Sequence, residues 1–424
     1  VTGSTYRWEL RNLKPIEIQE ASPRPSSMAP SVAISYFAAG GSKGDSPEFS
    51  TWSEVAEWFT NLVEERSAAN EAIRAKVAEL TASANTPLEK AAALGRYVQG
   101  VRYASIQLGI AKGGGYQPHP ATKVFAKNYG DCKGKATLLK SMLREAGVTS
   151  YTVSIYSGDP RRVKPDWPSP QQFNHAIVAI AVPPETDSPA AAEIEGFGRL
   201  LFFDPTDDDT PFGILPQHEQ DSYVLIEAGK RGALVKTPKA RPETNHLHRE
   251  VSAGLSADGS LEARIAEQSL GESASRQRRA YKALSAADYR QQLDRWLGRR
   301  VPGLRIDNLE LDPAFPGFQR QFAIAADSYG QRMGGGKLWV FRSSILDRED
   351  DYELRDEQRI HPFVLGAESF SESATIRLPE GYAVDELPDA VQLDSPYGSY
   401  EANWTVSGSE MQFSQKLTVN STVV

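Results

Sequence analysis

The sequence Tyr129-Gly130-Asp131-Cys132-Lys133-Gly134-Lys135-Ala136-Thr137-Leu138-Leu139 holds the only cysteine of this 424-residue chain. Small or apolar residues recur at helical spacing from Cys132, and the stripe consists of Ala136, Leu139, Leu143 and Ala146, with Gly147 after it as a stop signal. The spacing predicts a helix that begins at Cys132 and ends near Ala146. A helix N-terminus favours a thiolate and stabilises an oxyanion that forms beside it. A free cysteine is also commonly a small buried apolar residue, so the helix start alone leaves both interpretations open.

Two strand patterns downstream of this helix carry a histidine and an aspartate. Residues 173–180 read as a strand with His175 near its start, and residues 200–206 read as a strand that leads into Asp204. Neighbouring antiparallel strands can bring the two side chains together, so that Asp204 fixes the tautomer of His175 while the other ring nitrogen faces Cys132. This predicts a thiol version of the Ser-His-Asp arrangement.

At these residues the chain resembles the transglutaminase-like branch of the papain-like thiol enzymes. The resemblance rests on Gly130-Asp131-Cys132, on Asn174-His175 and on Phe203-Asp204-Pro205-Thr206-Asp207, and it covers roughly residues 51–239. More narrowly, it is similar to a bacterial group in which this core lies between an uncharacterised β-rich N-terminal domain and a β-rich C-terminal domain. The resemblance implies an α+β fold in which the nucleophile helix packs against an antiparallel sheet.

The chain departs from the family pattern at two positions. Ala176 follows the histidine where many active transglutaminases have an aromatic or acidic residue, and Gly134 stands where the bacterial group often has an acidic one. In papain-like enzymes a residue upstream of the nucleophile also donates to the oxyanion. Gln107 and Tyr103 have donors of the right type, and either is a candidate for that role.

The remaining sequence predicts three parts. Residues 1–46 show strand-like alternation at 5–10 and 31–37, and the resemblance implies that they are the end of the N-terminal β-rich domain. Residues 47–242 are expected to form the transglutaminase-like core, whose early helices start at the capping boxes of Thr51 and Thr86. Residues 243–424 open with a hairpin at Asp258-Gly259, continue with two helical patterns and return to strands, which predicts a β-sandwich-like domain with a helical insert.

Composition limits the partners. The net charge of −8 is spread along the chain without a basic stripe, which argues against a nucleic-acid partner. No apolar run reaches the roughly 18 residues that a membrane span needs. A single cysteine excludes an internal disulfide and a cysteine-based zinc site, and no cofactor or metal site is expected. The acidic run Asp207-Asp208-Asp209 lacks the alternating ligands and turn glycine of a calcium loop, so we expect a solvated loop there.

The predicted function is that of a transglutaminase-like thiol enzyme, which acts on amide bonds of a protein or peptide through Cys132, His175, Asp204 and a thioester. Cross-linking, deamidation and peptidase outcomes all remain open. The alternative is a catalytically silent domain that serves as a peptide-binding or cell-surface assembly module. Because the bacterial group is largely exported, the resemblance implies a periplasmic or cell-surface location, with a signal peptide expected outside this chain.

Overall fold

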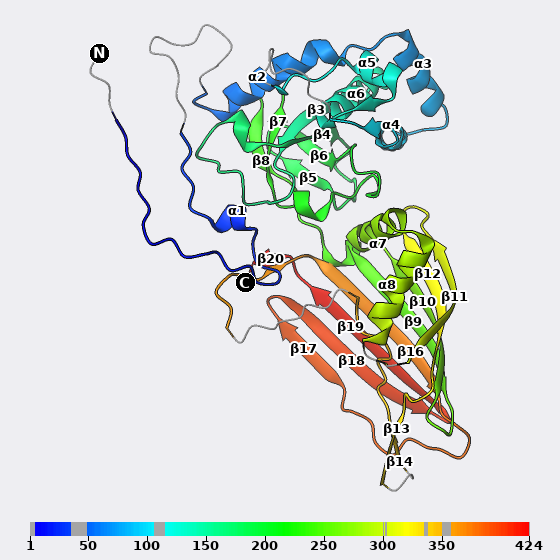
Figure 1. The fold of residues 1–424 in the computed structure, drawn as a ribbon. Coiled ribbons are helices and arrows are strands. Elements are labelled where there is room, and N and C mark those ends of the chain that lie inside the picture. Colours follow the sequence, from blue (N-terminus) through cyan, green and yellow to red (C-terminus); the bar gives the residue numbers. More distant parts are fainter. Residues whose placement is uncertain are drawn as a thin grey trace.

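The fold was analysed in a computed structural model of the chain, which describes residues 5–34, 49–105, 115–299, 301, 303–334, 338–349 and 358–423. Helices and an antiparallel sheet form the first half, and a larger sheet with two covering helices forms the second (Figure 1). The α+β class and the β-rich C-terminal region are therefore as the sequence predicted. Within the described residues, no helix has the length and apolar character required to cross a membrane.

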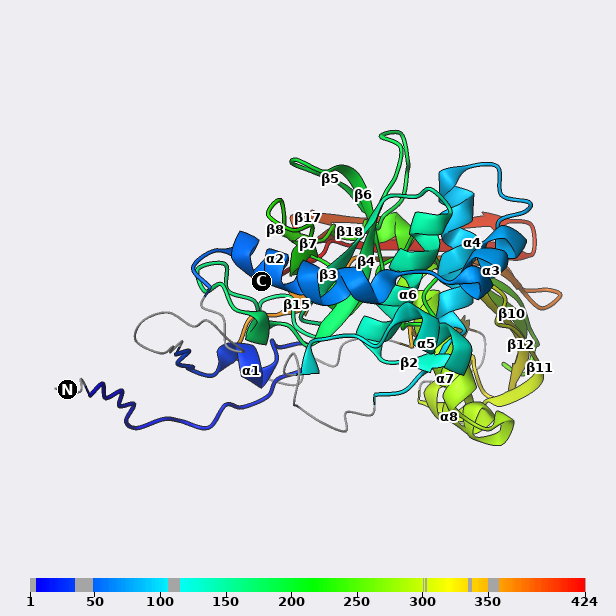
Figure 2. The same cartoon turned by 90° about the horizontal axis from the view of Figure 1, so that it is seen from above.

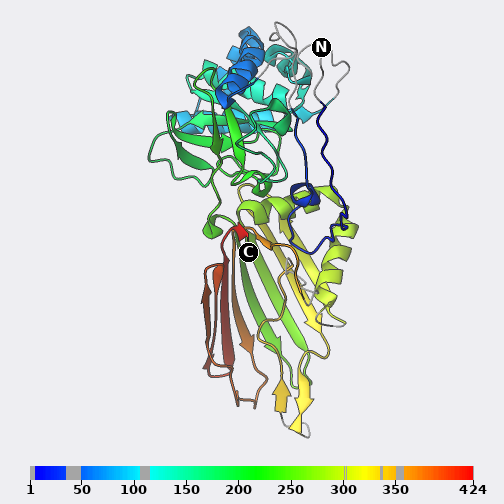
Figure 3. The same cartoon turned by 90° about the vertical axis from the view of Figure 1, so that its left-hand side faces the viewer.

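The N-terminal segment differs from the prediction. Residues 5–34 contain a single helical turn, α1 (Pro25–Met28), and none of them belongs to a strand. Polar and apolar residues do alternate at 5–10 and 31–34, but no described strand pairs with these residues, so the extended segment makes no described β-sheet hydrogen bonds. Residues 35–37 of the second expected strand lie outside the described residues. The segment instead follows the outside of the molecule (Figure 3), where Val364 N donates to Ala21 O at 2.8 Å.

The helices of the first half start where the sequence placed their caps. Thr51 and Thr86 each accept a hydrogen bond from the third helical residue, and Glu54 and Glu89 reach back to complete both capping boxes. The helices are α2 (Trp52–Glu64), α3 (Glu71–Leu80), α4 (Pro87–Gln99), α5 (Ala121–Lys127) and α6 (Cys132–Glu145). Gly147 follows α6 with φ +75°, the left-handed conformation that ends a helix and that glycine adopts without strain.

A six-stranded antiparallel sheet packs against these helices in the order β5-β6-β4-β3-β7-β8. Its strands are β3 (Ser150–Ile155), β4 (His175–Ala181), β5 (Ala191–Ile194), β6 (Gly198–Phe203), β7 (Tyr223–Glu227) and β8 (Ala233–Lys236). Helix α6 contacts β3 and β4, while α2 lies across β7 and β8 (Figure 2). Ala136, Leu139 and Leu143, the stripe read from the sequence, are buried in the shared core. The helix that begins with Cys132 is therefore fixed against the centre of the sheet.

The second half is built on one eight-stranded sheet, in the order β11-β12-β10-β9-β16-β19-β18-β17. Its strands are β9 (His246–Leu255), β10 (Leu261–Ser269), β11 (Arg305–Asp312), β12 (Phe318–Ala326), β16 (Glu368–Arg377), β17 (Val391–Ser395), β18 (Gly398–Ser407) and β19 (Glu410–Val419). The helical insert consists of α7 (Gly271–Ala283) and α8 (Ala286–Gly298). Three two-stranded sheets complete the described strands: β1 (Arg102–Tyr103) with β2 (Tyr129–Gly130), β13 (Gln331–Met333) with β14 (Leu338–Val340), and β15 (Val364–Leu365) with β20 (Thr422–Val423).

The arrangement of this β-rich region is a covered single sheet, whereas a sandwich would place a second sheet opposite the first. Helix α8 takes that place, because Leu293 and Trp296 are buried in one cluster with Phe322 of the sheet. Residues of β10 and β12 alternate between buried and largely exposed positions, as in a sheet with one covered face. The helical insert read from the sequence therefore supplies the layer that we expected from additional strands.

The acidic run after Asp204 is a contact between the two halves, and the expectation of a solvated loop was wrong. Asp207 pairs with Arg279 of α7 at 3.2 Å, and Asp209 pairs with Lys282 at 2.8 Å. Arg278, buried in the same helix, donates to the backbone oxygen of Asp209. The sequence could not reveal these basic partners because they lie about 70 positions further along the chain.

Candidate active site

Cys132 is the first residue of α6, and local hydrogen bonds fix its position. Asp131 is the N-cap, and its Oδ1 accepts a 2.9 Å hydrogen bond from the backbone N–H of Gly134. A Cβ added at Gly134 would approach Val124 to 3.1 Å and Asp131 Oδ1 to 3.2 Å, so the glycine allows close packing at the helix entry. Cys132 itself is 8% exposed, beside a cavity. The sulfur therefore lies at the positive end of a helix dipole, nearly removed from solvent.

His175 and Asp204 come together because their strands are neighbours. His175 opens β4, Asp204 directly follows β6, and β4 and β6 pair in antiparallel register. His175 Nε2 lies 3.0 Å from Asp204 Oδ2, and the backbone N–H of Thr206 donates to Asp204 Oδ1 at 2.7 Å. The carboxylate is thus held on both oxygens.

The two groups shift each other's pKa. Burial by itself lowers the pKa of His175, but the charge and hydrogen bond of Asp204 outweigh it and raise that pKa well above 6.5. Burial would raise the pKa of Asp204, whereas the His175 charge and hydrogen bond, together with bonds from Thr206, bring it below 3.8. Both shifts favour an imidazolium paired with a carboxylate.

The third expected residue, Cys132, lines the same cavity as His175, and after Asp204 it is among the groups that raise the pKa of His175. Because Nε2 faces Asp204, the ring nitrogen left for the sulfur is Nδ1. Tyr103, the first of the two oxyanion candidates, lies near Cys132, since β1 pairs in parallel with β2 and the charge of Cys132, after burial, raises the pKa of Tyr103. Gln107, the second candidate, lies outside the described residues.

Glu219 is a member of this cluster that the sequence did not predict. It is fully buried in the short turn 217–219, and its Oε1 lies 3.7 Å from His175 Nε2. Burial, and after it the charge of Asp204, raises the pKa of Glu219 well above 4.5. The turn has no periodic pattern and lies 15 positions after Asp204, so its approach to His175 depends on tertiary packing alone.

His175, Asp204 and Glu219 form one of two groups of described residues that could hold a metal ion, since their ligand atoms lie within 4.8 Å of one another; the other is Asp207, Asp208 and Asp209. A metal ion there would compete with the proton that His175 Nε2 shares with Asp204. The geometry favours the shared proton over a metal ion. The raised pKa of His175 and the lowered pKa of Asp204 favour an imidazolium beside a carboxylate, and the 3.0 Å between them is a normal hydrogen-bond distance.

A cavity of about 240 Å³ adjoins Cys132 and His175. Its lining is contributed by Phe59, Val63, Gly115, Tyr116, Cys132, Lys133, Ala136, Thr137, Thr152, Ser154, Phe173, Asn174, His175, Ala176 and Glu227. The reacting groups therefore face a space large enough for part of a substrate.

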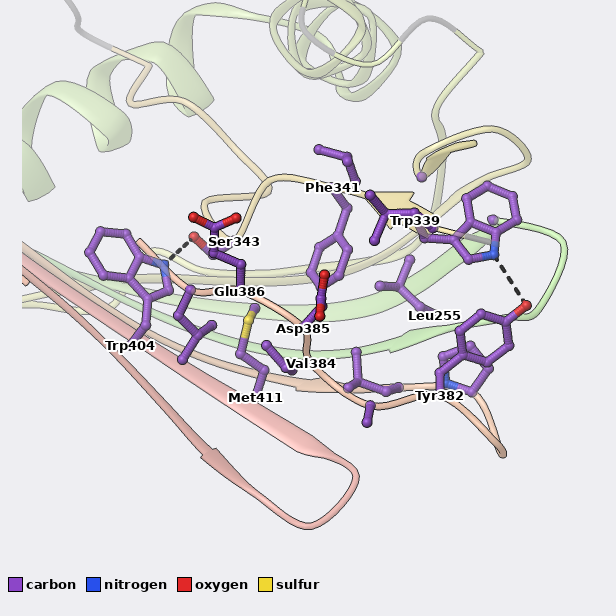
Figure 4. Close-up of a pocket in the computed structure, with 18 of the residues that line it drawn as sticks. Leu255, Trp339, Phe341, Ser343, Tyr382, Val384, Asp385, Glu386, Trp404 and Met411 are labelled. Atoms are coloured by element: carbon purple, nitrogen blue, oxygen red, sulfur yellow. Dashed lines mark hydrogen bonds between the residues drawn. The ribbon is translucent and has the colours of Figure 1, made fainter. Parts of the chain in front are cut away.

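A larger cavity, of about 440 Å³, lies in the second half, between the sheet and the loop 378–388 (Figure 4). Its walls are aromatic and apolar, and both indole N–H groups are already used, Trp404 donating to Ser343 at 2.7 Å and Trp339 to Tyr382 at 3.4 Å. No cysteine or histidine is among the described residues that line this cavity. The groups suited to nucleophilic chemistry are thus found beside the smaller cavity.

The comparisons with known proteins agree with this placement. Residues 74–186 match the model of the transglutaminase-like superfamily, and this segment includes Cys132 and His175 but ends before Asp204. Residues 337–424 match a domain of unknown function with a solved structure, DUF3858. A comparison with curated proteins gave no match.

One solved structure is similar over most of the chain. It is described as a "putative protease" from Parabacteroides distasonis ATCC 8503, is 14% identical, and aligns over 93% of this chain with a TM-score of 0.48. The aligned region spans 59% of the length of that protein.

Proposed function

From the transglutaminase-like core at residues 74–186, we propose that this chain is a thiol enzyme that transfers acyl groups from amide bonds of a protein or peptide. The observation that supports the proposal most is that Cys132 and His175 line one cavity while His175 is hydrogen-bonded to Asp204 at 3.0 Å. Nucleophile, base and orienting carboxylate in that order are the parts that covalent acyl transfer requires.

In the proposed first step the sulfur of Cys132 attacks the carbonyl carbon. The thiol proton passes to His175, and Asp204 stabilises the imidazolium that results. The carbonyl oxygen becomes an oxyanion near the N-terminus of α6, where backbone N–H groups and the Tyr103 hydroxyl are the candidate donors. His175 then returns the proton to the leaving amine, the C–N bond breaks, and a thioester remains on Cys132.

In the proposed second step an acceptor resolves the thioester. Water gives a carboxylic acid and thus a peptidase or deamidase, while an amine gives a new amide and thus a cross-link. In both cases His175 removes the acceptor proton and the thiol is restored. A periplasmic or cell-surface location is part of the proposal and rests on the resemblance to an exported bacterial group.

A catalytically silent peptide-binding module is the competing interpretation, and acylation with an activated ester separates the two. The protein is mixed with p-nitrophenyl acetate, and release of nitrophenolate is followed together with the intact mass. The proposal predicts a burst of about one nitrophenolate per chain, and one acetyl group on Cys132.

The Cys132→Ala variant and the unfolded wild-type protein are the controls. The acetyl group should disappear in the first, and its formation should be much slower in the second. Acetylation of folded wild-type protein no faster than that of the unfolded chain would refute the proposed activity and favour the binding module.

A further inference from the structure

The cavity beside Cys132 has a buried carboxyl group in its wall. Glu227 closes β7 and is 3% exposed. Its Oε2 accepts a 2.5 Å hydrogen bond from Thr152 Oγ1, and its Oε1 accepts a 2.7 Å hydrogen bond from Ser154 Oγ. Thr152 and Glu227 are paired across β3 and β7, and all three residues line the cavity. The sheet therefore presents a carboxyl group and two hydroxyls to the space that adjoins the nucleophile.

No described cation neutralises Glu227. Lys140, which has an electrostatic effect on it, is paired with Glu64 at 3.2 Å. Burial raises the pKa of Glu227, and the two hydroxyl donors and the charge of Lys140 oppose this effect without cancelling it. A carboxylate has about four acceptor positions, of which the two hydroxyls use two. The group therefore has acceptor capacity left for a ligand, and a cation bound beside it would favour its charged form.

The two cations that line the same cavity are already paired. Lys133 binds Asp131 at 2.6 Å at the start of α6, and His175 binds Asp204 at 3.0 Å. Neither therefore competes for Glu227, and the ionisable group of the lining without an ionic partner is an acid.

The remaining walls suit an alkyl chain. Phe59, Val63, Tyr116 and Phe173 supply aromatic and aliphatic surface, and the rings of Phe59 and Tyr116 meet edge to face with centroids 5.7 Å apart. Apolar walls cover the methylene groups of a long side chain, and aromatic faces attract a cation. A neutral apolar side chain would fill the same walls but would leave the remaining acceptor positions of the Glu227 carboxyl desolvated and without a donor.

We propose that this cavity binds a basic side chain of the substrate, so that the residue whose carbonyl reacts with Cys132 is lysine or arginine. The inference rests on the proposed thiol chemistry for its role, since the side chain would orient the carbonyl toward the sulfur. Glu227 is then a specificity residue, distant from the bonds that break.

The test compares two affinity reagents on the whole chain, acetyl-lysine chloromethyl ketone and its norleucine analogue, with labelling of Cys132 followed by mass spectrometry. Both reagents carry the same reactive group and the same four-carbon stem, and only the ammonium differs. The wild-type protein is expected to react about ten- to a hundredfold faster with the lysine reagent. Equal rates with the two reagents would overturn the inference.

Three variants identify the source of the preference. Glu227→Gln should remove it and react with both reagents at similar rates, whereas Glu227→Asp should keep it in part because the charge remains. Glu193→Gln, an exposed glutamate of the same sheet, is the matched control and should behave as wild type. A lysine preference that survives in a folded Glu227→Gln protein would contradict the assignment.

Iodoacetamide separates this inference from the proposed activity. Rapid reaction of iodoacetamide with Cys132 and no preference for the lysine reagent would leave the thiol chemistry standing and refute the pocket assignment. If Cys132 proves inert, saturation-transfer NMR with acetyl-lysine methylamide and the norleucine amide tests the cavity directly. Preferential binding of the lysine amide that is lost in Glu227→Gln would support the inference, and equal binding would refute it.

Discussion

Replacing Asp204 by Asn tests the part of the cluster that makes His175 a stronger base. The change keeps the size of the side chain and an oxygen that can accept from Nε2, but it removes the charge. Two unit charges at the observed 3.0 Å attract by about 5 to 6 kcal/mol at an effective dielectric constant near 20. The amide oxygen still accepts a hydrogen bond, so we expect about half of this attraction, about 2 to 3 kcal/mol, to be lost. That loss corresponds to about a thirty- to a hundred-and-fiftyfold decrease in the acetylation rate.

The assay is the rate of acetylation by p-nitrophenyl acetate between pH 6 and pH 9. Asp204 raises the pKa of His175, so the imidazolium that pairs with a thiolate persists to higher pH in the wild type than in Asp204→Asn. The deficit should be largest near pH 6 and should shrink near pH 9, where a thiol ionises without help.

Asp208→Asn is the matched control, because Asp208 lies in the same loop and its side chain is 65% exposed. It should retain the wild-type rate. Wild-type rates in Asp204→Asn at pH 6, with Asp208→Asn unchanged, would refute the electrostatic role of Asp204.

Three further variants have expected outcomes. Glu219→Gln should be more stable than the wild type at alkaline pH. The raised pKa of Glu219 makes the unfolding free energy of the wild type fall by about 1.4 kcal/mol for each pH unit between about pH 4.5 and that pKa. Below about pH 4.5 the melting temperatures of the two proteins should coincide. Tyr103→Phe should slow acetylation of Cys132 by about a hundredfold, because the variant lacks the hydroxyl that donates to the oxyanion. Alkylation by iodoacetamide forms no oxyanion, so its rate should stay near that of the wild type. Glu267→Gln should lower the unfolding free energy of the C-terminal region by about 3 to 5 kcal/mol in a urea titration, because it removes the buried carboxylate that Arg249 and Arg320 share.

Each of these variants has a matched control. Glu195→Gln is exposed and should leave the pH dependence of melting unchanged. Tyr129→Phe, on the strand that pairs with Tyr103, should acetylate at the wild-type rate. Glu262→Gln, an exposed position on the same strand as Glu267, should unfold as wild type. A variant that matches its control contradicts the corresponding prediction.

The parts of the fold that the sequence predicted are those with a local signal. The helix at Cys132 follows from the spacing of Ala136, Leu139 and Leu143 and from Gly147, and the capping boxes mark the starts of α2 and α4. Strand patterns at His175 and Asp204 also predicted that the two side chains would meet, since antiparallel strands close in the chain tend to pair; β4 and β6 do pair, although the short β5 lies between them in the chain.

The parts that the sequence could not predict depend on contacts between distant segments. Glu219 lies in a turn without periodicity, and Glu227 reads only as the polar end of an apolar strand. Their approach to His175 and to the Cys132 cavity is decided by how β7 pairs with β3 and by how the preceding turn packs. The acidic residues after Asp204 read as a solvated loop, because their basic partners on α7 lie far along the chain.

The most direct test of the assembled site is the pH dependence of alkylation by iodoacetamide, compared between the wild type and His175→Ala. With a single cysteine in the chain, the signal belongs to Cys132. If His175 and Cys132 work as a pair, alkylation remains fast at pH values well below about 8.5, where an ordinary thiol loses its reactivity, and His175→Ala loses this reactivity at low pH. Slow alkylation below that pH in the wild type, with the same profile in His175→Ala, would contradict the proposed thiol enzyme.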